Sequence, residues 1–587
     1  MRVRRVAAVI FAWVAVVGLA RGVVALPERC PDVTAAQARA AAHEAVGWFG
    51  RNQQFDGRWV YRYDRRADEV DRRSHVVRQA GITLSLYQAH AAGIDGALEP
   101  ADAGVDWLLG ELVHDDDWSA VRRGDLAPTG GSALLVAALA TRYQTEGAGR
   151  YDDEMRALGR FLVAMTEPSG AVAANWDIDA RRPVPDDYSP FFTGETYFAL
   201  ALLATVDPGG GWASTAERIG AYLPERDDAE DRFPPISDHW GAYGLAQMAV
   251  DAGRALGDDE RAYARRLAGI FSIEVRFESQ RTGSGLNLHL LRGPQVLGAG
   301  LGTIGEGLGS LWRVADTGDA LDDERAAIAE RLRCVAGMLA DRQVSAAEAE
   351  AAGRPGLARG AWFHDDVTQM DDQQHSLSAL LLANPVLTGE ATTGARSTDG
   401  VSVGRGVWLL VLTLAAVNPP RVRRLAGRLP SRTVAVGTVG SGMVVLLAAL
   451  VAGPLLRAAD ISPSTVLVSA GLVVVLVAIV DALNRRPGPV PSAGPGGGAL
   501  VPLAVPALVR PSVVHLAVAA SAAGGVAVGA LVATGVVLAG LSLLLPTPEV
   551  VGDTTRGDAL ATVATWVVVA IAVLGGVDVA AHGVFSV

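Results

Sequence analysis

The feature that most constrains this chain of 587 residues is a repeat of two kinds of helical segment between residues 33 and 385. Segments of the first kind have regularly spaced apolar residues and one polar face, at 34–52, 100–113, 151–165, 212–223, 258–277 and 322–340. Each is followed by a more apolar segment rich in small residues, at 78–91, 131–144, 194–206, 238–252, 304–315 and 372–383. The first pattern is typical of a helix with one face in water, and the second of a helix surrounded by protein.

The six pairs recur about every 45–70 residues, and such self-similarity is the mark of a repeat architecture. An open superhelical array is one solution. Six pairs without an obvious polar cap at either end favour closure into a ring. Segments 57–63 (GRWVYRY) and 170–176 (GAVAANW) alternate in the manner of short strands. The sequence therefore predicts an all-α fold, an (α/α)6 toroid of six helical hairpins with small β-hairpins on one rim.

A change in composition near residue 404 divides the chain into two parts. Charged residues crowd the part before it, whereas Val, Leu, Ala and Gly dominate the part after it. Five apolar segments follow, at 401–418, 433–456, 464–484, 513–545 and 558–580. A helix needs about 20 apolar residues to cross a bilayer, so the first is short and the fourth is long enough to tilt or bend. We expect a toroid at 26–400 and a membrane region of about five transmembrane helices at 401–587.

The N-terminus predicts export of the toroid. A basic start (MRVRR), an apolar run and small residues before Leu26 are typical of a signal peptide or an anchor helix at 1–25. Arginines cluster at 421–432 and again at 485–486, which places both loops in the cytoplasm by the positive-inside rule. Residues 26–400 should then be extracytoplasmic, and the Pro/Gly-rich stretch 487–498 a flexible cytoplasmic linker.

The apolar segments carry almost no charged groups. Ionisable residues inside a membrane indicate transport or proton relay, so we expect these helices to contact the lipid bilayer as an anchor, or to bind a membrane protein partner. The net charge of −12 argues against a nucleic-acid partner, because phosphate binding needs a basic surface.

Cysteine chemistry is limited to Cys30 and Cys334. Two cysteines are too few for the usual Cys-rich zinc site. Outside the cytoplasm they could form one disulfide between the start of the domain and a late helix, and two free buried thiols are the alternative. Nucleotide-loop, serine-hydrolase and H-E-x-x-H patterns are missing from the sequence, so it predicts neither a metal nor a cofactor.

The second segment of most pairs begins with polar residues. In a closed toroid these inner helices run in one direction, so their N-termini converge on one end of the central cavity. The charged and polar residues at these starts are Arg78, Glu195, Asp238, His239, Glu306, Asp371 and His375. Their gathering is the strongest functional signal in the sequence.

Three short motifs resemble those of the six-hairpin glycosidase-like superfamily. They are the rim segment GRWVYRY at 57–63, the step VRQAG at 77–81 and the run DDQQHSL at 371–377. That superfamily includes glycan hydrolases, polysaccharide lyases and uronyl epimerases. The resemblance implies a carbohydrate-facing cavity, and it does not choose among these reactions.

Glycoside hydrolysis needs two carboxyl groups, one of them held protonated as the acid. We predict Glu195 as the acid and Asp238 as the base, with Glu306 or Asp371 as substitutes. A structural interpretation competes, since acids at helix starts often serve as caps, and the glycines beside Glu195 and Glu306 equally indicate close helix packing.

Other residues are candidates for binding or proton transfer. Arg78 would hold a uronate or phosphate through a two-pronged contact, or would instead join the first hairpin to the last by pairing with Asp371 or Asp372. His239 and His375 would act as acid or base in lyase or epimerase chemistry, as would Tyr61 and Tyr63; a core histidine is the alternative for His375. Aromatic faces on which a sugar ring would stack, or which would only pack the core, are those of Trp59, Trp176 and Trp240.

The sequence thus predicts a membrane-tethered enzyme acting on a cell-envelope glycan, with a glycoside hydrolase as the first expectation. A non-catalytic glycan-binding or scaffolding protein is the main alternative. A polysaccharide lyase or uronyl epimerase is a further one. The Asp371–Asp372 pair is the only feature that leaves a terpenoid cyclase possible. A zinc-dependent peptide cyclase is not predicted, because the Cys/His metal set of those enzymes is missing from the sequence.

Overall fold

The computed structural model describes two compact units of the chain. The first is Glu28–Gly394, described at residues 28–229, 237–281, 299–364 and 366–389. The second joins Met1–Pro27 to Ala395–Val587 and is described mainly at 403–417, 431–458, 470–478 and 510–541, except for residue 525. The predicted signal peptide or anchor at 1–25 and the predicted linker at 487–498 lie outside the described residues.

The first unit contains all six predicted helix pairs. Its outer helices are α2 (Ala35–Asn52), α4 (Leu98–Leu109), α6 (Asp152–Ala164), α8 (Trp212–Ala229), α10 (Asp258–Ser279) and α13 (Arg325–Arg342). Its inner helices are α3 (Val76–Ala91), α5 (Thr129–Glu146), α7 (Phe192–Val206), α9 (His239–Ala246), α12 (Ala299–Thr317) and α16 (Met370–Thr388). The predicted segment 238–252 is shorter as an α-helix than expected, because a π-helical turn, Gln247–Asp251, ends it.

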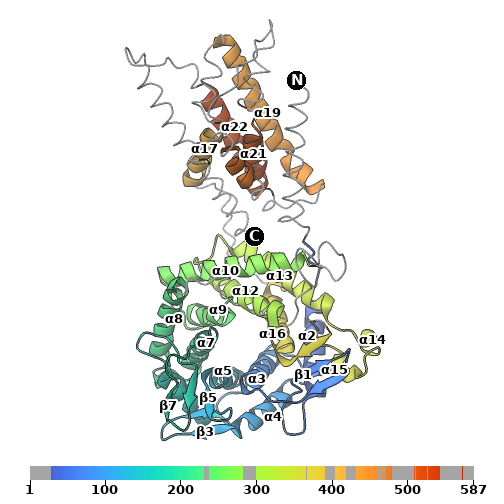
Figure 1. The fold of residues 1–587 in the computed structure, drawn as a ribbon, viewed down its shortest axis with the longest axis vertical. Helices are drawn as coiled ribbons and strands as arrows, with labels where there is room; N and C mark the ends of the chain where they lie inside the picture. Colours follow the sequence, from blue (N-terminus) through green and yellow to red (C-terminus); the bar gives the residue numbers. More distant parts are fainter. Residues whose placement is uncertain are drawn as a thin grey trace. The chain divides into compact units, whose positions relative to one another are not determined.

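The inner helices form a closed ring. Each contacts the next in chain order from α3 to α16, and α16 contacts α3. Figure 1 shows this ring, with the outer helices around it. Closure of the repeat, as against an open array, is therefore confirmed.

Glycines allow close packing of α12 against α16. A Cβ atom added to Gly302 would lie 2.5 Å from the carbonyl carbon of His375, and one added to Gly305 would lie 2.6 Å from the Cβ of Ala379. These two glycines share one helix face, since residues three apart are neighbours there. The packing explains why this inner segment is rich in glycine.

Short strands decorate one rim of the ring. They form the sheets β2-β1-β8, β3-β4 and β5-β6-β7. Their bounds are β1 Arg62–Asp64, β2 Glu69–Asp71, β3 Leu112–His114, β4 Ser119–Val121, β5 Leu126–Pro128, β6 Asn175–Asp177, β7 Arg182–Pro183 and β8 Val367–Gln369. Each strand lies on a connection from an outer helix to the next inner helix, so all of them are at the N-terminal end of the inner helices. The predicted strands at 57–63 and 170–176 overlap β1 and β6 only at their last residues.

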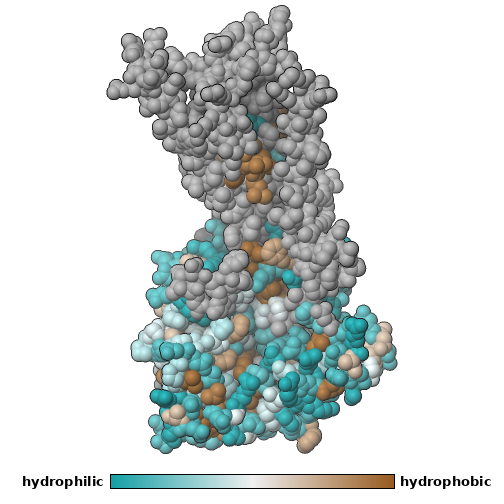
Figure 2. Space-filling view, in the orientation of Figure 1, coloured by the Kyte–Doolittle hydropathy of each residue, from teal (hydrophilic) through white to brown (hydrophobic). Residues whose placement is uncertain are grey.

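Strand β1 also joins the two ends of the repeat. It pairs antiparallel with β8, with Arg62 opposite Gln369 and Asp64 opposite Val367. The first hairpin is thus fastened to the last on the rim as well as through α3 and α16. On the face in view, the described surface of this unit is mainly hydrophilic, as expected of a domain in water (Figure 2).

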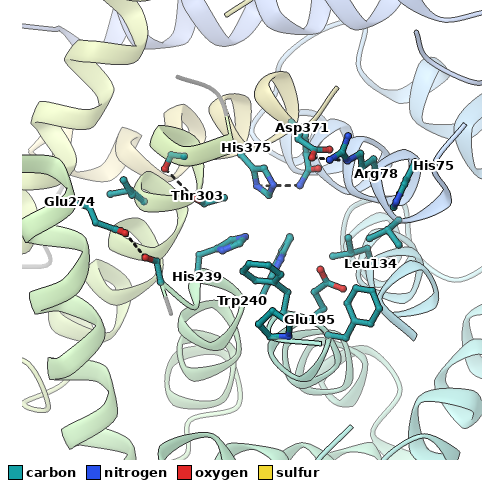
Figure 3. Close-up of a pocket in the computed structure, with 18 residues that line it drawn as sticks. His75, Arg78, Leu134, Glu195, His239, Trp240, Glu274, Thr303, Asp371 and His375 are labelled. Carbon is teal, nitrogen blue, oxygen red and sulfur yellow. Dashed lines mark hydrogen bonds and ion pairs between the residues drawn. The ribbon is translucent and has the colours of Figure 1, made fainter. Parts of the chain in front are cut away.

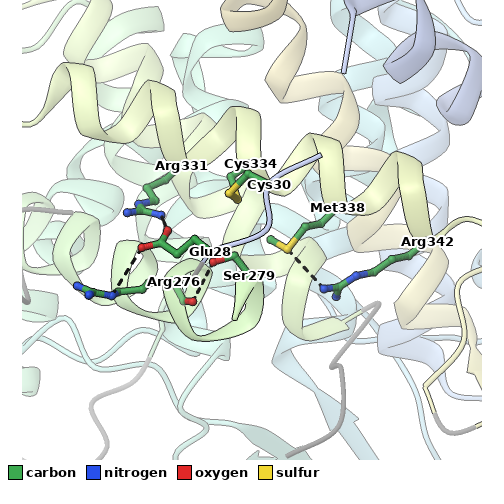
Figure 4. The surroundings of a disulfide bond; sticks show 8 residues. All are labelled: Glu28, Cys30, Arg276, Ser279, Arg331, Cys334, Met338 and Arg342. Atoms are coloured by element: carbon green, nitrogen blue, oxygen red, sulfur yellow. Dashed lines mark hydrogen bonds and ion pairs between the residues drawn. A yellow bond between two sulfur atoms is a disulfide. The ribbon is translucent and has the colours of Figure 1, made fainter. Parts of the chain in front are cut away.

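A disulfide and an ion cluster fix the start of the first unit (Figure 4). Cys30 is bonded to Cys334 of α13, with Cα atoms 4.7 Å apart. Glu28 pairs with Arg331 and lies 3.7 Å from Nε of Arg276. The disulfide expected for a domain outside the cytoplasm is therefore present, and the alternative of two free thiols is wrong.

The second unit is helical where it is described. Its helices are α17 (Val403–Val417), α19 (Ser431–Ala458), α21 (Pro511–Gly524) and α22 (Val526–Leu541). Among the described residues one helix is long and apolar enough to cross a membrane, over Val434–Ala452 with a mean hydropathy of 2.3. Its length alone is weak evidence of a span. About half of the predicted span at 464–484, and nearly all of that at 558–580, lie outside the described residues.

The fourth predicted span requires a correction. Residues 513–545 were expected to form one long helix, tilted or bent, whereas the structure has α21 and α22, which pack against each other. The sequence has two consecutive glycines, Gly524 and Gly525, between these helices. A glycine inside a helix lowers its stability by about 1 kcal/mol relative to alanine.

Candidate active site

A cavity of about 640 Å³ opens among the N-terminal turns of the inner helices. Every inner helix contributes lining residues, from Arg78 on α3 to His375 on α16, and the close-up in Figure 3 shows side chains from several of them facing the same space. The predicted convergence of these helix ends is confirmed. Of the predicted site residues, those that line the cavity are Arg78, Glu195, His239, Trp240, Asp371 and His375.

Glu195 is the most isolated carboxyl group of the cavity. Its side chain is 4% exposed, and its Oε2 atom makes no hydrogen bond with any residue that the structure describes. Burial raises the pKa of Glu195 to about 8, with the positive charge of His375 acting in the opposite direction. This carboxyl group is therefore mostly protonated at neutral pH and can donate a proton.

Glycines on α5 and on α7 itself allow the close packing around Glu195. A Cβ atom added to Gly130 of α5 would lie 2.2 Å from its Oε2 atom. A Cβ atom added to Gly194 would lie 2.6 Å from Oδ1 of Asp238 and 2.9 Å from a backbone nitrogen of α9. The close helix packing that the glycines indicated is therefore present around this carboxyl group.

Asp238, predicted as the base, is committed elsewhere and does not line the cavity. It caps α9, where its Oδ1 accepts from the backbone N–H of Gly241 at 2.8 Å. Its Oδ2 accepts from the Tyr263 hydroxyl at 3.0 Å and from Arg226 at 3.3 Å. Since the side chain is fully buried among these donors, we correct this assignment: Asp238 positions α9 and has no free oxygen with which to take a proton.

Arg78 and Asp371 form an ion pair at the edge of the cavity. Arg78 Nε lies 2.8 Å from Asp371 Oδ2, and Arg78 Nη1 donates to the Tyr61 hydroxyl at 2.5 Å and to Gln369 Oε1 at 3.1 Å. Arg78 therefore joins the first hairpin to the last, as the structural alternative expected. Burial raises the pKa of Asp371, and Arg78 limits this rise. Oδ1 of Asp371 makes no hydrogen bond within the described part of the chain.

Glu306 and His375 form a second buried pair, between α12 and α16. Glu306 Oε2 lies 2.5 Å from Nδ1 of His375, and its Oε1 accepts from the Tyr243 hydroxyl at 3.3 Å. Burial lowers the pKa of His375, but the neighbouring Glu306 raises it by more, so the pKa lies above its ordinary value. Burial also raises the pKa of Glu306, opposed by His375. Glu306 is not in the cavity wall, although its partner His375 is.

His239 completes this group from α9. Its Nε2 lies 3.8 Å from Glu306 Oε2 and makes no hydrogen bond with the residues described here. Burial, and then the charge of His375, lowers the pKa of His239 well below its ordinary value. The pKa values of the two histidines in the cavity wall are thus shifted in opposite directions.

The aromatic candidates separate into two groups. Trp240 lines the cavity and stacks on Tyr243 at 5.3 Å. Trp59 and Tyr63 are fully buried in the core, where they cannot meet a substrate. Trp176 packs against Trp118 at 5.1 Å, and neither it nor Tyr61 lines the cavity. A stacking role is therefore not supported for Trp59 and Trp176, nor an acid–base role for Tyr63.

Two titratable lining residues, Glu274 and His75, escaped the sequence predictions. Glu274 of α10 faces the cavity, and its Oε1 accepts from the Ser237 hydroxyl at 2.5 Å. Glu274 lies three positions after Phe271 and therefore on the same, apolar face of α10. An acid on that face was the feature of the sequence that could have indicated this residue. His75 precedes α3, and burial, with Arg123 and Arg78, lowers its pKa to about 4.

No family model matches the chain, and no curated protein matches it. Among the solved structures to which it is similar is a cellobiose 2-epimerase from Spirochaeta thermophila, with 12% identity, 61% of this chain and 98% of that chain covered, and a TM-score of 0.44. An unsaturated glucuronyl hydrolase specific for heparin has 11% identity, coverage of 59% and 97%, and a TM-score of 0.41. A type II terpene cyclase from Scytonema has 13% identity, coverage of 60% and 99%, and a TM-score of 0.38. The closed ring is shown by the helix contacts alone, and nothing about the reaction follows from these similarities.

Proposed function

We propose that the unit Glu28–Gly394 is an extracytoplasmic glycoside hydrolase acting on a cell-envelope polysaccharide. The observation that carries this proposal is Glu195, a buried carboxyl group that lines a cavity of about 640 Å³ and whose Oε2 atom has no hydrogen-bond partner among the described residues. This burial raises its pKa to about 8. A glycosidase needs such a group to protonate the leaving-group oxygen.

Asp371 is the second carboxyl group in this proposal, in place of Asp238. It lines the same cavity, and its Oδ1 is free of hydrogen bonds to the described residues. Arg78 holds the other oxygen and favours the charged form. Asp371 would activate the attacking water or attack the sugar itself, depending on its separation from Glu195. Trp240 and Phe192 supply apolar faces of the kind that pack against a sugar ring.

The proposal includes attachment to the cell membrane through the second unit. The apolar stretch Val434–Ala452 is one membrane-spanning helix in this scheme, and the other predicted spans complete a multi-pass anchor that contacts lipid or a membrane protein partner. The Cys30–Cys334 disulfide supports an extracytoplasmic location, because such bonds are rare in the cytoplasm.

The test is hydrolysis of purified cell-envelope polysaccharide by the full-length chain, followed as release of reducing ends. Glu195→Gln keeps the shape of the neutral acid but cannot donate its proton, so we expect the rate to fall by about 10²- to 10⁴-fold. Glu217→Gln, on the exposed face of α8, is the matched control and should retain the rate. Equal hydrolysis by wild type and Glu195→Gln would show that Glu195 is not the acid.

His239 and His375 favour one second candidate, a sugar epimerase or polysaccharide lyase. Two histidines at one cavity, with the pKa of His239 lowered and that of His375 raised, suit removal of a proton from a sugar carbon and its replacement. Incubation of the polysaccharide in D₂O separates the two reactions. Deuterium at a sugar carbon or a new double bond indicates the second candidate, whereas new reducing ends without either indicate hydrolysis.

A further inference from the structure

Three side chains with metal-binding atoms meet at the inner wall of the cavity. His239 of α9, Glu306 of α12 and His375 of α16 each present one such atom, and these atoms all lie within 4.8 Å of one another. Ligand atoms around a tetrahedral zinc ion, bound at about 2.0–2.2 Å, are about 3.4 Å apart. The distances from Glu306 Oε2, 2.5 Å to Nδ1 of His375 and 3.8 Å to Nε2 of His239, lie on either side of that value.

We infer that His239, Glu306 and His375 form a binding site for one divalent transition-metal ion. Two imidazole nitrogens and one carboxylate oxygen make a donor set that suits zinc and its first-row neighbours. The sequence offered no such prediction, because the three ligands come from three helices and follow no short motif.

His239 is the observation that points to a ligand beyond an ordinary ion pair. Its side chain is 3% exposed, yet Nε2 has no hydrogen-bond partner among the described residues. Leaving a buried polar atom unsatisfied costs about 1–3 kcal/mol, and a metal ion on Nε2 would remove that cost. A simple pairing of Glu306 with His375 leaves this nitrogen unexplained.

The surroundings hold the ligands in place. Tyr243 donates to the remaining oxygen of Glu306, which is the kind of outer contact that orients a metal-bound carboxylate. Gly302 lets α12 approach the backbone of His375, so that Glu306 reaches across. The Asp238 cap fixes the start of α9, where His239 is the first residue.

The site would be open on one side. His239 and His375 line the cavity whereas Glu306 does not, so the ion would lie between a buried carboxylate and the open space. Three protein ligands and one open position are typical of catalytic rather than structural metal sites. An ion there would occupy the nitrogen that the epimerase or lyase candidate needs as its base. The inference does not depend on the hydrolase proposal, which uses Glu195 and Asp371.

The test is zinc binding by the full-length chain in detergent. The chain is purified without a polyhistidine tag, stripped with EDTA, and then incubated with zinc before unbound metal is removed. We expect about one zinc per chain by mass spectrometry of the metal content, and cobalt(II) should give a visible absorption band. His239→Gln, Glu306→Gln and His375→Gln should each weaken zinc binding by more than about 100-fold. Tyr243→Phe should weaken it by about 10- to 100-fold, as for an outer-shell contact.

His75→Gln is the matched control, since His75 lines the same cavity but is not a ligand. It should bind zinc like the wild type. The folding of each variant is checked by thermal melting in EDTA, and a variant that does not fold is left out of the comparison. The inference is overturned if the wild type binds less than a tenth of an equivalent of zinc, or if every ligand variant that folds binds zinc normally. Either result would leave the Glu195 proposal standing, because its test measures hydrolysis.

Discussion

The pH dependence of stability gives a direct test of the environment of Glu195. The folded chain holds its proton up to a pKa of about 8, whereas the ordinary value is 4.5. The folded state therefore binds more protons than the unfolded state between these two pH values. The resulting stabilisation is fully present below about pH 4.5 and is lost as the pH rises through 8.

The size of this effect follows from the two pKa values. A difference of about 3.5 corresponds to about 5 kcal/mol, at 1.36 kcal/mol for each pKa unit. Unfolding of a unit of about 370 residues has an entropy of about 0.8 kcal/mol/K, at about 2.1 cal/mol/K per residue. Glu195→Gln removes the titrating group. Because about 4 of these 5 kcal/mol are lost between pH 5 and pH 9, the melting temperature of the wild type should fall by about 5 °C relative to this variant over that range.

The assay is thermal melting of the full-length chain in detergent and EDTA, followed by tryptophan fluorescence. Trp48, Trp59 and Trp362 are almost completely buried in the ring, so their emission reports its unfolding. Glu217→Gln should melt in parallel with the wild type at every pH. A difference between wild type and Glu195→Gln that stays constant from pH 5 to pH 9 would refute the reasoning, because Glu195 would then titrate as an ordinary acid.

Three further predictions concern packing and covalent structure, and each is measured by thermal or denaturant unfolding. Cys30→Ser should destabilise the first unit by about 2–5 kcal/mol, and a reducing agent should lower the melting temperature of the wild type but not of this variant. Gly302→Ala should cost about 1–3 kcal/mol because its Cβ meets the backbone of α16, whereas Gly50→Ala, with nothing within 4 Å, should stabilise α2 by about 0.5–1 kcal/mol. Asp238→Asn should cost about 1–3 kcal/mol by weakening the buried hydrogen bonds that Tyr263 and Arg226 donate to this side chain, and the folded fraction should keep any hydrolytic activity of the wild type. A stable but inactive variant would restore Asp238 as the base.

The helices and their order were predictable because helical periodicity is local. Polar residues three or four positions apart mark the outer helices, and the small residues of segments such as 304–315 mark the inner ones. The shared direction of the inner helices then placed Arg78, Glu195 and His375 at one end of the ring, and the cavity contains all three.

The roles of the individual acids were not predictable, because they depend on partners from distant helices. Asp238 and Glu195 look alike in the sequence, each at the start of an inner helix. Only the structure shows that Tyr263 and Arg226 satisfy Asp238, while Oε2 of Glu195 has no such donor in the described chain. The metal-binding arrangement of His239 with two residues of later helices depended in the same way on three-dimensional packing.

The fastening of α3 to α16 has a consequence for the synthesis of this protein. The ribosome makes Arg78 about 300 residues before it makes Asp371 and His375, the last parts of the cavity wall. A nascent chain, or a fragment that ends before α16, therefore lacks an enclosed pocket. The cavity should become enclosed in a single step when the final hairpin docks, so incomplete products should lack the proposed hydrolytic activity altogether.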